Sequence, residues 1–205
     1  MGLLKTFSRH SIVLQVMPMQ TYQDTAAENA KEVAGKWPLG YITTTSTGFA
    51  LKEKFRKAGA NTQNIVFVDA ISRAINDGPA QADGCYYTSK PAALGEIEKT
   101  SQRLIRHGFR HFVFDSLTGF FSCRKKAHAK EFVANLAKRF RKNGVKCVFY
   151  SLEEPKNAKR LIGMEGLADF VLKAKAPKKV RAKQKAQKEK KKQSRKNESE
   201  SGRGS

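Results

Sequence analysis

Residues 111–121 read HFVFDSLTGFF, and this stretch decides which fold we expect. His111 to Phe114 have the apolar and aromatic character of a strand that is buried on both faces. Asp115 and Ser116 follow at once, so a carboxylate stands at the carboxyl end of the predicted strand. In many nucleotide-hydrolysing folds a carboxylate at this place holds Mg²⁺ beside a bound triphosphate. The stretch therefore leaves two alternatives, a working Mg²⁺ site or the remnant of one.

Strand-like and helix-like segments alternate on both sides of this stretch. The predicted strands are 11–17, 40–45, 64–70, 111–115, 145–151 and 168–173. The predicted helices cover about 25–36, 49–59, 94–107, 127–143 and 158–162, and the segment up to Pro91 is predicted to be irregular. Apolar strands separated by helices of roughly 10–16 residues indicate a mostly parallel sheet with helices on both faces. We therefore expect an α/β fold in three layers.

In such sheets ligands bind beyond the carboxyl ends of the strands. The polar side chains that we expect at this edge are Thr44, Thr45, Asp69, Asp115, Ser116, Glu153 and Glu154. The first five are the candidates for a residual nucleotide or Mg²⁺ site, and the two glutamates are alternatively solvated loop charges. Asp115 and Ser116 have a structural alternative as well, because such side chains cap the loop into a following helix.

Four segments, taken in their order along the chain, resemble one family. They are YITTTSTGFALKEKFRKAGANTQNIVFVDAISR (41–73), TSKPAALGEIEKTSQRLI (88–105), HFVFDSLTGFF (111–121) and VKCVFYSLEE (145–154). Together they resemble the RecA superfamily, in particular its KaiC-like archaeal branch, over residues 10–173. The resemblance implies a RecA-like three-layer fold, an archaeal protein, and the Walker B position for Asp115, with Ser116 beside it.

The chain departs from this family where the phosphates would bind. A phosphate loop needs glycines for its backbone N–H groups, a lysine for the β/γ oxygens and a Ser or Thr for Mg²⁺. The connection after the first strand, VMPMQTYQDTAAENAK (16–31), has no glycine and no Gly-Lys-Thr/Ser. Thr44, Thr45 and Ser46 stand where the resemblance places catalytic glutamates. We therefore expect no catalytic residues and no cofactor, and we keep ATP with Mg²⁺ as the alternative.

The composition changes near residue 173. From there to Ser205 the chain has 14 Lys and Arg and 3 Glu, a net charge of +11, and almost no large apolar residues. Such a segment buries too little apolar surface to offset its chain entropy, so we predict a disordered tail. The chain is thus divided into a domain, 1–173, and a basic tail, 174–205.

Basic residues are the strongest functional signal, because the residues before Lys173 carry the other +11 of the +22 net charge. The nucleic-acid-binding candidates are Arg124, Lys125, Lys126, Arg139, Arg141, Lys142, Lys178, Lys179, Arg181, Lys183, Lys185, Lys190, Lys191 and Lys192. A cationic surface of this kind suits phosphate backbones. The alternatives are an acidic protein partner, an anionic membrane surface, which the lack of aromatic or large aliphatic residues in the tail disfavours, and a solubilising tail without a specific partner.

Four aromatic residues, Trp37, Tyr41, Tyr86 and Tyr87, have two interpretations. They could stack on nucleic-acid bases, or they belong to the core, which is the commoner place for aromatic side chains. No RNP-like pattern accompanies them.

We therefore predict a non-catalytic RecA/KaiC-like domain that acts as a regulatory or interaction module and binds nucleic acid through its basic surface and tail. The alternative is a nucleotide-binding protein or weak ATPase with an unconventional phosphate site. Further expected partners are an acidic protein, a second copy of the chain or a RecA-like protein. No apolar run reaches the roughly 18–20 residues that span a bilayer. Three scattered cysteines, Cys85, Cys123 and Cys147, and four histidines without ligand spacing predict a reducing cytoplasm and no metal site.

Overall fold

The computed structural model describes residues 2–75, 83–90, 93–123, 126–153 and 165–173. The chain divides into two units, Met1–Ala174 and Lys175–Ser205, and all described residues belong to the first. The predicted tail and the predicted helix at 158–162 lie outside the described residues.

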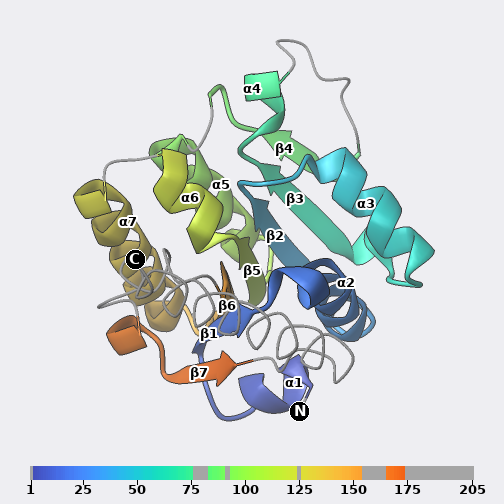
Figure 1. Cartoon of the computed structure of the whole chain (residues 1–205), viewed down its shortest axis with the longest axis horizontal. Coiled ribbons are helices and arrows are strands. Elements are labelled where there is room, and N and C mark those ends of the chain that lie inside the picture. Colours follow the sequence, from blue (N-terminus) through green and yellow to red (C-terminus); the bar gives the residue numbers. More distant parts are fainter. Residues whose placement is uncertain (1, 76–82, 91–92, 124–125, 154–164, 174–205) are drawn as a thin grey trace, which may run out of the picture. The chain divides into compact units, whose positions relative to one another are not determined.

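A seven-stranded sheet forms the centre of the domain (Figure 1). Its strands are β1 (Ile12–Met17), β2 (Leu39–Thr43), β3 (Ile65–Asp69), β4 (Cys85–Tyr87), β5 (His111–Asp115), β6 (Lys146–Leu152) and β7 (Phe170–Lys173). They lie in the order β4-β3-β2-β5-β6-β1-β7, and every pair of neighbours is parallel. The prediction of a mostly parallel sheet is confirmed.

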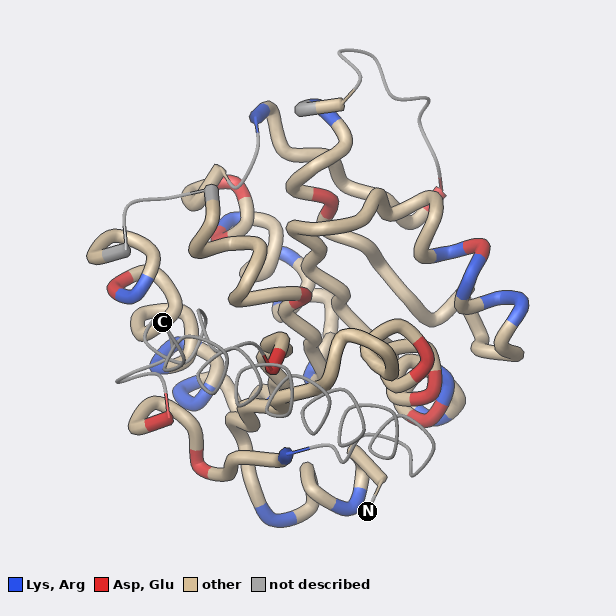
Figure 2. The backbone as a smooth tube through the Cα atoms, viewed as in Figure 1, with Lys and Arg blue, Asp and Glu red and all other residues tan. Residues whose placement is uncertain are grey.

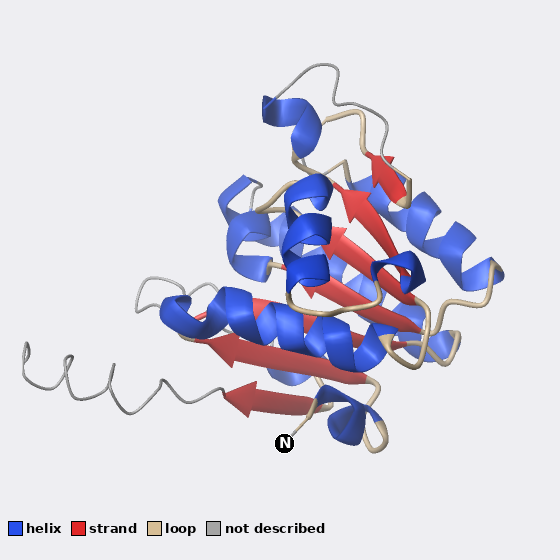
Figure 3. Cartoon of the chain, turned by 90° about the vertical axis from the view of Figure 1, so that its right-hand side faces the viewer, coloured by secondary structure: helices blue, strands red, loops and turns tan. Residues whose placement is uncertain are grey.

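Helices cover both faces of this sheet, as the side view in Figure 3 shows. They are α1 (Leu3–Phe7), α2 (Met19–Ala34), α3 (Gly48–Lys57), α4 (Ser72–Ile75), α5 (Leu94–Arg106), α6 (Leu117–Cys123) and α7 (Lys126–Lys142), with 3₁₀ turns at Thr62–Asn64 and Glu165–Leu167. Apolar residues of α1, α2 and α3 share one buried cluster, and those of α5, α6 and α7 share the other. The predicted three-layer α/β fold is thus confirmed.

Alternating side chains of the strands fill the two buried clusters. Tyr41 and Val113 belong to the cluster under α2 and α3, whereas Ile42, Phe112 and Phe114 belong to the cluster under α5 and α7. All five are fully buried, because both faces of the sheet are covered. This period of two places the polar residue after Phe114, which is Asp115, on the α2–α3 side.

Several elements differ from the sequence-based expectation. Helix α2 begins at Met19, six residues before the capping-box residue Thr25, because β1 ends at Met17 and leaves only Pro18 as a connection. Pro18 is the N-cap and has an extended backbone with ψ 143°, so its missing N–H removes no hydrogen bond from the helix. The short elements α1, α4, α6 and β4 were not predicted, because segments of three to seven residues show too little periodicity.

Within the described residues, no helix is long and apolar enough to cross a membrane.

Candidate functional site

The carboxyl ends of β2, β3 and β5 form the edge at which the predicted site residues meet. Thr43, the last residue of β2, pairs with Asp69 on one side and with Asp115 on the other. After β2 the chain enters α3 on one face of the sheet, and after β5 it enters α6 on the opposite face. Such a divergence of neighbouring connections is the place where open α/β sheets form a ligand crevice. We call this region the carboxyl edge.

Asp115 lies in the interior of this edge and is held by a tyrosine. It is 1% exposed, and the Tyr41 hydroxyl donates a hydrogen bond of 2.5 Å to its Oδ2. The Thr45 hydroxyl lies 3.4 Å from its Oδ1. Burial raises the pKa of Asp115 to about 7, and burial also raises the pKa of Tyr41 well above its ordinary value. Asp115 is therefore a shielded carboxyl group with a tyrosine partner rather than an open anion.

Thr44 and Ser116 form a second set of contacts beside it. Thr44 N–H donates to the Asp115 carbonyl at 2.6 Å, and the Ser116 N–H donates to Thr44 Oγ1 at 3.1 Å. The peptide bond between Asp115 and Ser116 is cis. Gly119 of α6 makes room for this loop, because a Cβ there would lie 2.3 Å from Thr45 Cγ2. Ser116 Oγ accepts from the Gly119 N–H at 3.2 Å, so the predicted capping role of Ser116 agrees with its contacts.

Asp69, on the other side of β2, accepts hydrogen bonds from the first turns of two helices. Its Oδ2 accepts from the Gly48 N–H and from the Ser72 hydroxyl, each at 2.6 Å. Its Oδ1 accepts from the N–H groups of Ile71 and Ser72 at 3.0 and 2.8 Å. Both carboxylate oxygens are thus occupied at the first turns of α3 and α4, which makes Asp69 a structural anchor.

Glu153 lies elsewhere on this edge, where its N–H donates to the Met17 carbonyl beside β1. Glu154 lies outside the described residues.

The residues at this edge do not fit a magnesium triphosphate. A phosphate loop wraps several backbone N–H groups around the phosphates, whereas here Pro18 alone joins β1 to α2 and contributes no N–H. The carboxyl group that would hold Mg²⁺ accepts hydrogen bonds from Tyr41 and Thr45, and the Thr44 hydroxyl donates to the Asp115 and Ser116 carbonyls. In the described residues no cluster of three or more His, Cys, Asp or Glu could hold a metal ion.

A small cavity separates α2 from α3 next to Asp115. It has a volume of about 220 Å³ and is lined by Tyr22, Gln23, Ala26, Ser46, Ala50, Leu51, Lys54, Phe55 and Asp115. Ligand pockets commonly measure about 300–1,000 Å³, so this cavity is smaller than a usual ligand pocket. The Tyr22 hydroxyl is buried and has no hydrogen-bond partner among the described residues.

Three other buried polar side chains near this cavity hydrogen-bond to one another. Asn29 donates to Gln15 Oε1 at 2.9 Å and to the Tyr150 hydroxyl at 2.8 Å. Burial is the main reason why the pKa of Tyr150 is raised, so this hydroxyl stays protonated.

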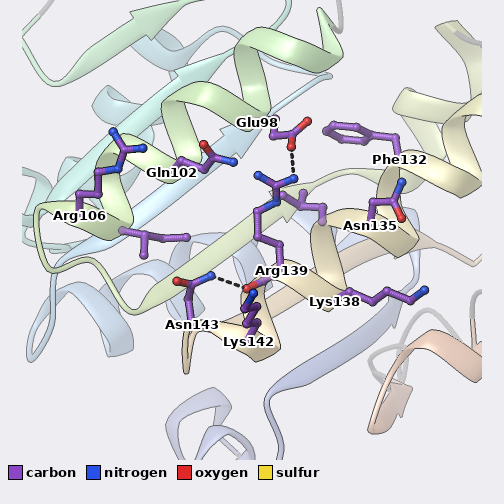
Figure 4. Close-up of a pocket in the computed structure, with 11 residues that line it drawn as sticks. Glu98, Gln102, Arg106, Phe132, Asn135, Lys138, Arg139, Lys142 and Asn143 are labelled. Atoms are coloured by element: carbon purple, nitrogen blue, oxygen red, sulfur yellow. Dashed lines mark hydrogen bonds and ion pairs between the residues drawn. The ribbon is translucent and has the colours of Figure 1, made fainter.

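A larger groove lies on the opposite face of the sheet, between α5 and α7 (Figure 4). It has a volume of about 630 Å³ and is lined by Glu98, Gln102, Ile105, Arg106, Phe132, Asn135, Leu136, Lys138, Arg139, Lys142 and Asn143. Buried Ile105, Phe132 and Leu136 give it an apolar floor, and four basic side chains stand against one carboxylate. Glu98 is paired with Arg139, as the dashed line in Figure 4 shows. We call this feature the α5–α7 groove.

The predicted nucleic-acid-binding residues of α7 have separate environments. Arg139 and Lys142 line the groove, whereas Arg141 is bound to Asp169 at 2.6 Å and to the Leu167 carbonyl at 2.5 Å. Arg106 and Lys138 line the groove without having been predicted. The sequence did not reveal this cluster because its members come from two helices. Arg106 belongs to α5, and the basic residues beside it in the groove belong to α7, far along the chain.

The side chains of the other basic candidates lie outside the described part of the structure. Lys126 begins α7, and its side chain is not described. Arg124, Lys125, Lys178, Lys179, Arg181, Lys183, Lys185, Lys190, Lys191 and Lys192 lie outside the described residues.

Basic residues also gather where the strands begin, which we call the amino edge. Helices α3, α5 and α7 end there with Arg56 and Lys57, Arg103 and Arg106, and Arg139, Arg141 and Lys142 in their last turns. Figure 2 shows such basic residues at the ends of α3 and α7. Because helix carbonyls give a negative dipole at this end, cations are favoured there.

The four aromatic candidates are separated by the fold. Tyr41 is fully buried and Tyr87 is partly buried. Tyr86 on the edge strand β4 is 40% exposed, with the Arg103 guanidinium 5.6 Å from its ring centre. Trp37 is 51% exposed, just after α2. Only Trp37 and Tyr86 therefore remain as exposed aromatic surfaces among the four.

Comparison with solved structures gives a clear relation of fold. The crystal structure of a KaiC-like protein from the hyperthermophilic archaeon Pyrococcus horikoshii matches with a TM-score of 0.57 and 14% sequence identity, covering 80% of this chain and 72% of that protein. No protein-family model and no curated protein sequence matches the chain. The RecA-like, KaiC-like fold expected from the sequence is thus confirmed at the level of architecture.

Proposed function

We propose that the protein is a non-catalytic RecA/KaiC-like domain that binds nucleic acid through its basic surface and tail, and that it serves as an interaction or regulatory module. The observation that carries the proposal is the α5–α7 groove, where Arg106, Lys138, Arg139 and Lys142 face a single carboxylate. A concave surface with a cationic excess attracts the phosphate backbone and releases its counterions.

The composition of the groove supports nucleic acid rather than a purely electrostatic surface. Amide groups of Gln102, Asn135 and Asn143 lie beside the basic side chains. They supply donors and acceptors for phosphate, sugar or base edges. The tail adds a net charge of +11 from Lys173 onward, which would increase affinity without sequence preference.

The carboxyl edge supports the non-catalytic part of the proposal. Asp115 is buried against Tyr41, and Pro18 replaces a phosphate loop. Among the described residues of this edge, the polar groups that phosphoryl transfer requires are therefore either missing or engaged in contacts within the protein. The fold then serves as a scaffold whose exposed face carries the activity.

The test is a charge reversal in the groove of the full-length chain. We expect Arg106→Glu with Lys142→Glu to lower the affinity for a labelled oligonucleotide roughly ten-fold or more at about 50 mM salt. The slope of log affinity against log salt should become shallower by about 2, because two phosphate contacts are lost. Fluorescence anisotropy measured between about 50 and 200 mM salt gives both values.

The matched control changes the charge equally at the carboxyl edge. Arg73→Glu with Lys90→Glu removes two exposed cations near α4 and β4, and it should leave the salt slope unchanged. Equal losses in both double variants would contradict a role for the groove and leave only net charge. Saturable heat from Mg²⁺–ATP titration that Asp115→Asn abolishes would contradict the non-catalytic part and favour a nucleotide-binding protein.

A further inference from the structure

We propose that Trp37 is a stacking platform for an unpaired base, and that the preferred ligand is therefore single-stranded nucleic acid. This inference rests on the proposed nucleic-acid binding and adds to it the class of strand and the contact residue. It concerns a part of the amino edge that does not line the α5–α7 groove.

Three neighbouring aromatic rings, which we call the stack, run from the core to the surface, although only His111 and Trp37 are stacked and Phe7 is tilted by 46° against His111. Phe7 of α1 is 3% exposed and lies 5.8 Å from the His111 ring. His111 lies 5.8 Å from the Trp37 ring, at an interplanar angle of 23°. Trp37 ends the stack and is 51% exposed. An indole that covers a neighbour with one face and remains half exposed presents its other face and edges to solvent.

The backbone holds this indole in place without help from its outer face. The Trp37 N–H donates to the Val33 carbonyl at 2.9 Å, which extends the end of α2 by one turn. Trp37 is followed by Pro38 and then by β2, so both sides of the residue are fixed. The ring contact with His111 also restricts the side chain, which reduces the side-chain entropy that would be lost when a base binds.

Basic residues neighbour Trp37 and His111 along the chain and across the sheet. Lys36 directly precedes Trp37, Arg110 directly precedes His111, and Lys146 pairs with His111 across β5 and β6. Burial, with Lys146 as a second cause, lowers the pKa of His111, so its ring is neutral at physiological pH. The ring therefore supports the indole as an aromatic surface. Lys36 is exposed, whereas the Arg110 guanidinium donates to the Ile105 and Phe109 carbonyls at 2.7 and 3.0 Å and the Lys146 ammonium donates to the Ser11 hydroxyl at 3.4 Å, so these two contribute positive charge rather than free donors.

Nearby carboxylates are engaged with the protein. Glu32 accepts from the N–H groups of Leu3 and Leu4 at 2.8 and 3.2 Å. Asp169 accepts from the N–H groups of Ser11 and Ile12 and is paired with Arg141. The described residues around the stack thus leave an excess of positive charge, which favours a polyanion over an uncharged partner.

Stacking decides between single strands and duplexes. Bases within a duplex are stacked on one another, whereas the splayed bases of a single strand are free to stack on aromatic side chains. An isolated exposed indole beside cations fits the pattern of single-strand binding, in which a basic surface holds the backbone and a ring holds the base.

Trp37 is the single tryptophan of the chain, so its fluorescence reports directly on this site. Full-length protein would be titrated with oligothymidylate, oligouridylate and a duplex of equal length. We expect saturable quenching by one or both single strands and no comparable quenching by the duplex, even where anisotropy shows that the duplex is bound. The two single-strand arms separate DNA from RNA.

Variants complete the test through anisotropy of labelled strands. Trp37→Ala should weaken single-strand binding roughly 5- to 150-fold and leave duplex binding unchanged. Trp37→Phe keeps a ring and should retain most of the affinity, which guards against loss by misfolding. Phe49→Ala is the matched control, because Phe49 is 64% exposed on α3 at the carboxyl edge and should have no effect.

The outcomes separate this inference from the proposed function. If nucleic acid binds without changing Trp37 fluorescence, or binds Trp37→Ala with the affinity of the parent chain, Trp37 is not a stacking platform. The proposed binding through the groove and tail would still stand. Equal quenching by duplex and single strand overturns the strand preference. No binding of any strand at low salt, with binding of polyglutamate instead, overturns both proposals in favour of an acidic protein partner.

Discussion

The carboxyl and amino edges of one sheet use their polar side chains in different ways. At the carboxyl edge Asp69 and Asp115 are each 1% exposed and accept hydrogen bonds from within the protein. At the amino edge Lys36, Arg106 and Lys142 are exposed and have no ion pair among the described residues. The two aspartates at the edge that a RecA-like fold would use for nucleotide are thus engaged within the protein, whereas the opposite edge carries basic side chains without an ion pair among the described residues.

This difference indicates how one fold can keep its architecture while its ligand-binding surface moves from one edge of the sheet to the other. Helices α3, α5 and α7 all end at the amino edge, where their dipoles favour cations. A few basic residues there therefore have a structural reason and need no ligand. Ion pairing distinguishes the two groups of cations. Arg56, Arg139 and Arg141 have carboxylate partners, while Lys57, Arg106 and Lys142 have none among the described residues. Changes at the carboxyl edge should consequently alter stability, and changes at the amino edge should alter binding.

The largest expected effect is at the carboxyl edge. Tyr41→Ala removes a fully buried ring that packs against Phe55 and Phe67 and donates to Asp115. We expect a loss of about 3–5 kcal/mol in the free energy of unfolding, measured by urea denaturation. Tyr86→Ala, at a tyrosine that is 40% exposed, is the control and should cost less than about 1 kcal/mol.

The folded fraction of Tyr41→Ala should bind oligonucleotides like the parent chain. A variant that stays stable but loses its affinity would contradict the assignment of binding to the amino edge, because it would place binding at the carboxyl edge.

The next effect is a pH dependence that arises from Asp115. An unfolded aspartate has a pKa near 3.9, whereas burial raises the pKa of folded Asp115 to about 7. The folded state therefore binds the proton more tightly. Its contribution to stability is fully present below about pH 4 and is lost as the pH rises through 7. Between pH 5 and pH 8 we expect a loss of about 2–3 kcal/mol from this group.

Asp115→Asn isolates this contribution, because asparagine keeps the shape and an oxygen acceptor for Tyr41 but does not titrate. Urea unfolding of both proteins at pH 5 and pH 8 gives the difference between them, and the other titrating groups cancel. Parallel pH profiles for the two proteins would show that Asp115 stays ionised, which would reopen the carboxyl edge as a cation site.

The sequence predicted the layers of the fold well because long apolar strands carry their own signal. The runs around Val13, Phe67, Phe112 and Val148 need only burial on two faces to be recognised. The fold also brought Thr44, Thr45, Asp115 and Ser116 together, as expected from the rule that parallel strands end at one edge. Topology alone was sufficient for that part of the site.

The use of those residues could not be predicted, because it depends on contacts between distant segments. Tyr41 and Asp115 are 74 positions apart, and nothing near either residue signals their hydrogen bond. The same holds for Arg141 and Asp169, 28 positions apart, which turned a predicted phosphate ligand into one half of an ion pair. The exposure of Trp37, likewise, follows from where α2 ends and not from its neighbours in the sequence.

The smallest expected effect concerns two neighbouring residues of the amino edge, one paired and one unpaired. Arg141 and Lys142 are adjacent and both exposed, but only Arg141 is held by Asp169 and the Leu167 carbonyl. Lys142→Gln should make the salt slope of oligonucleotide binding shallower by about 1 and change stability by less than about 0.5 kcal/mol. Arg141→Gln should leave that slope nearly unchanged and cost about 0.5–1 kcal/mol of stability, the range of a solvent-screened surface ion pair. Anisotropy and urea unfolding of the two single variants would thus rank them in opposite orders. The same order in both measurements would mean that the ion pair does not keep Arg141 from the ligand, and that paired and unpaired cations at this edge serve the same role.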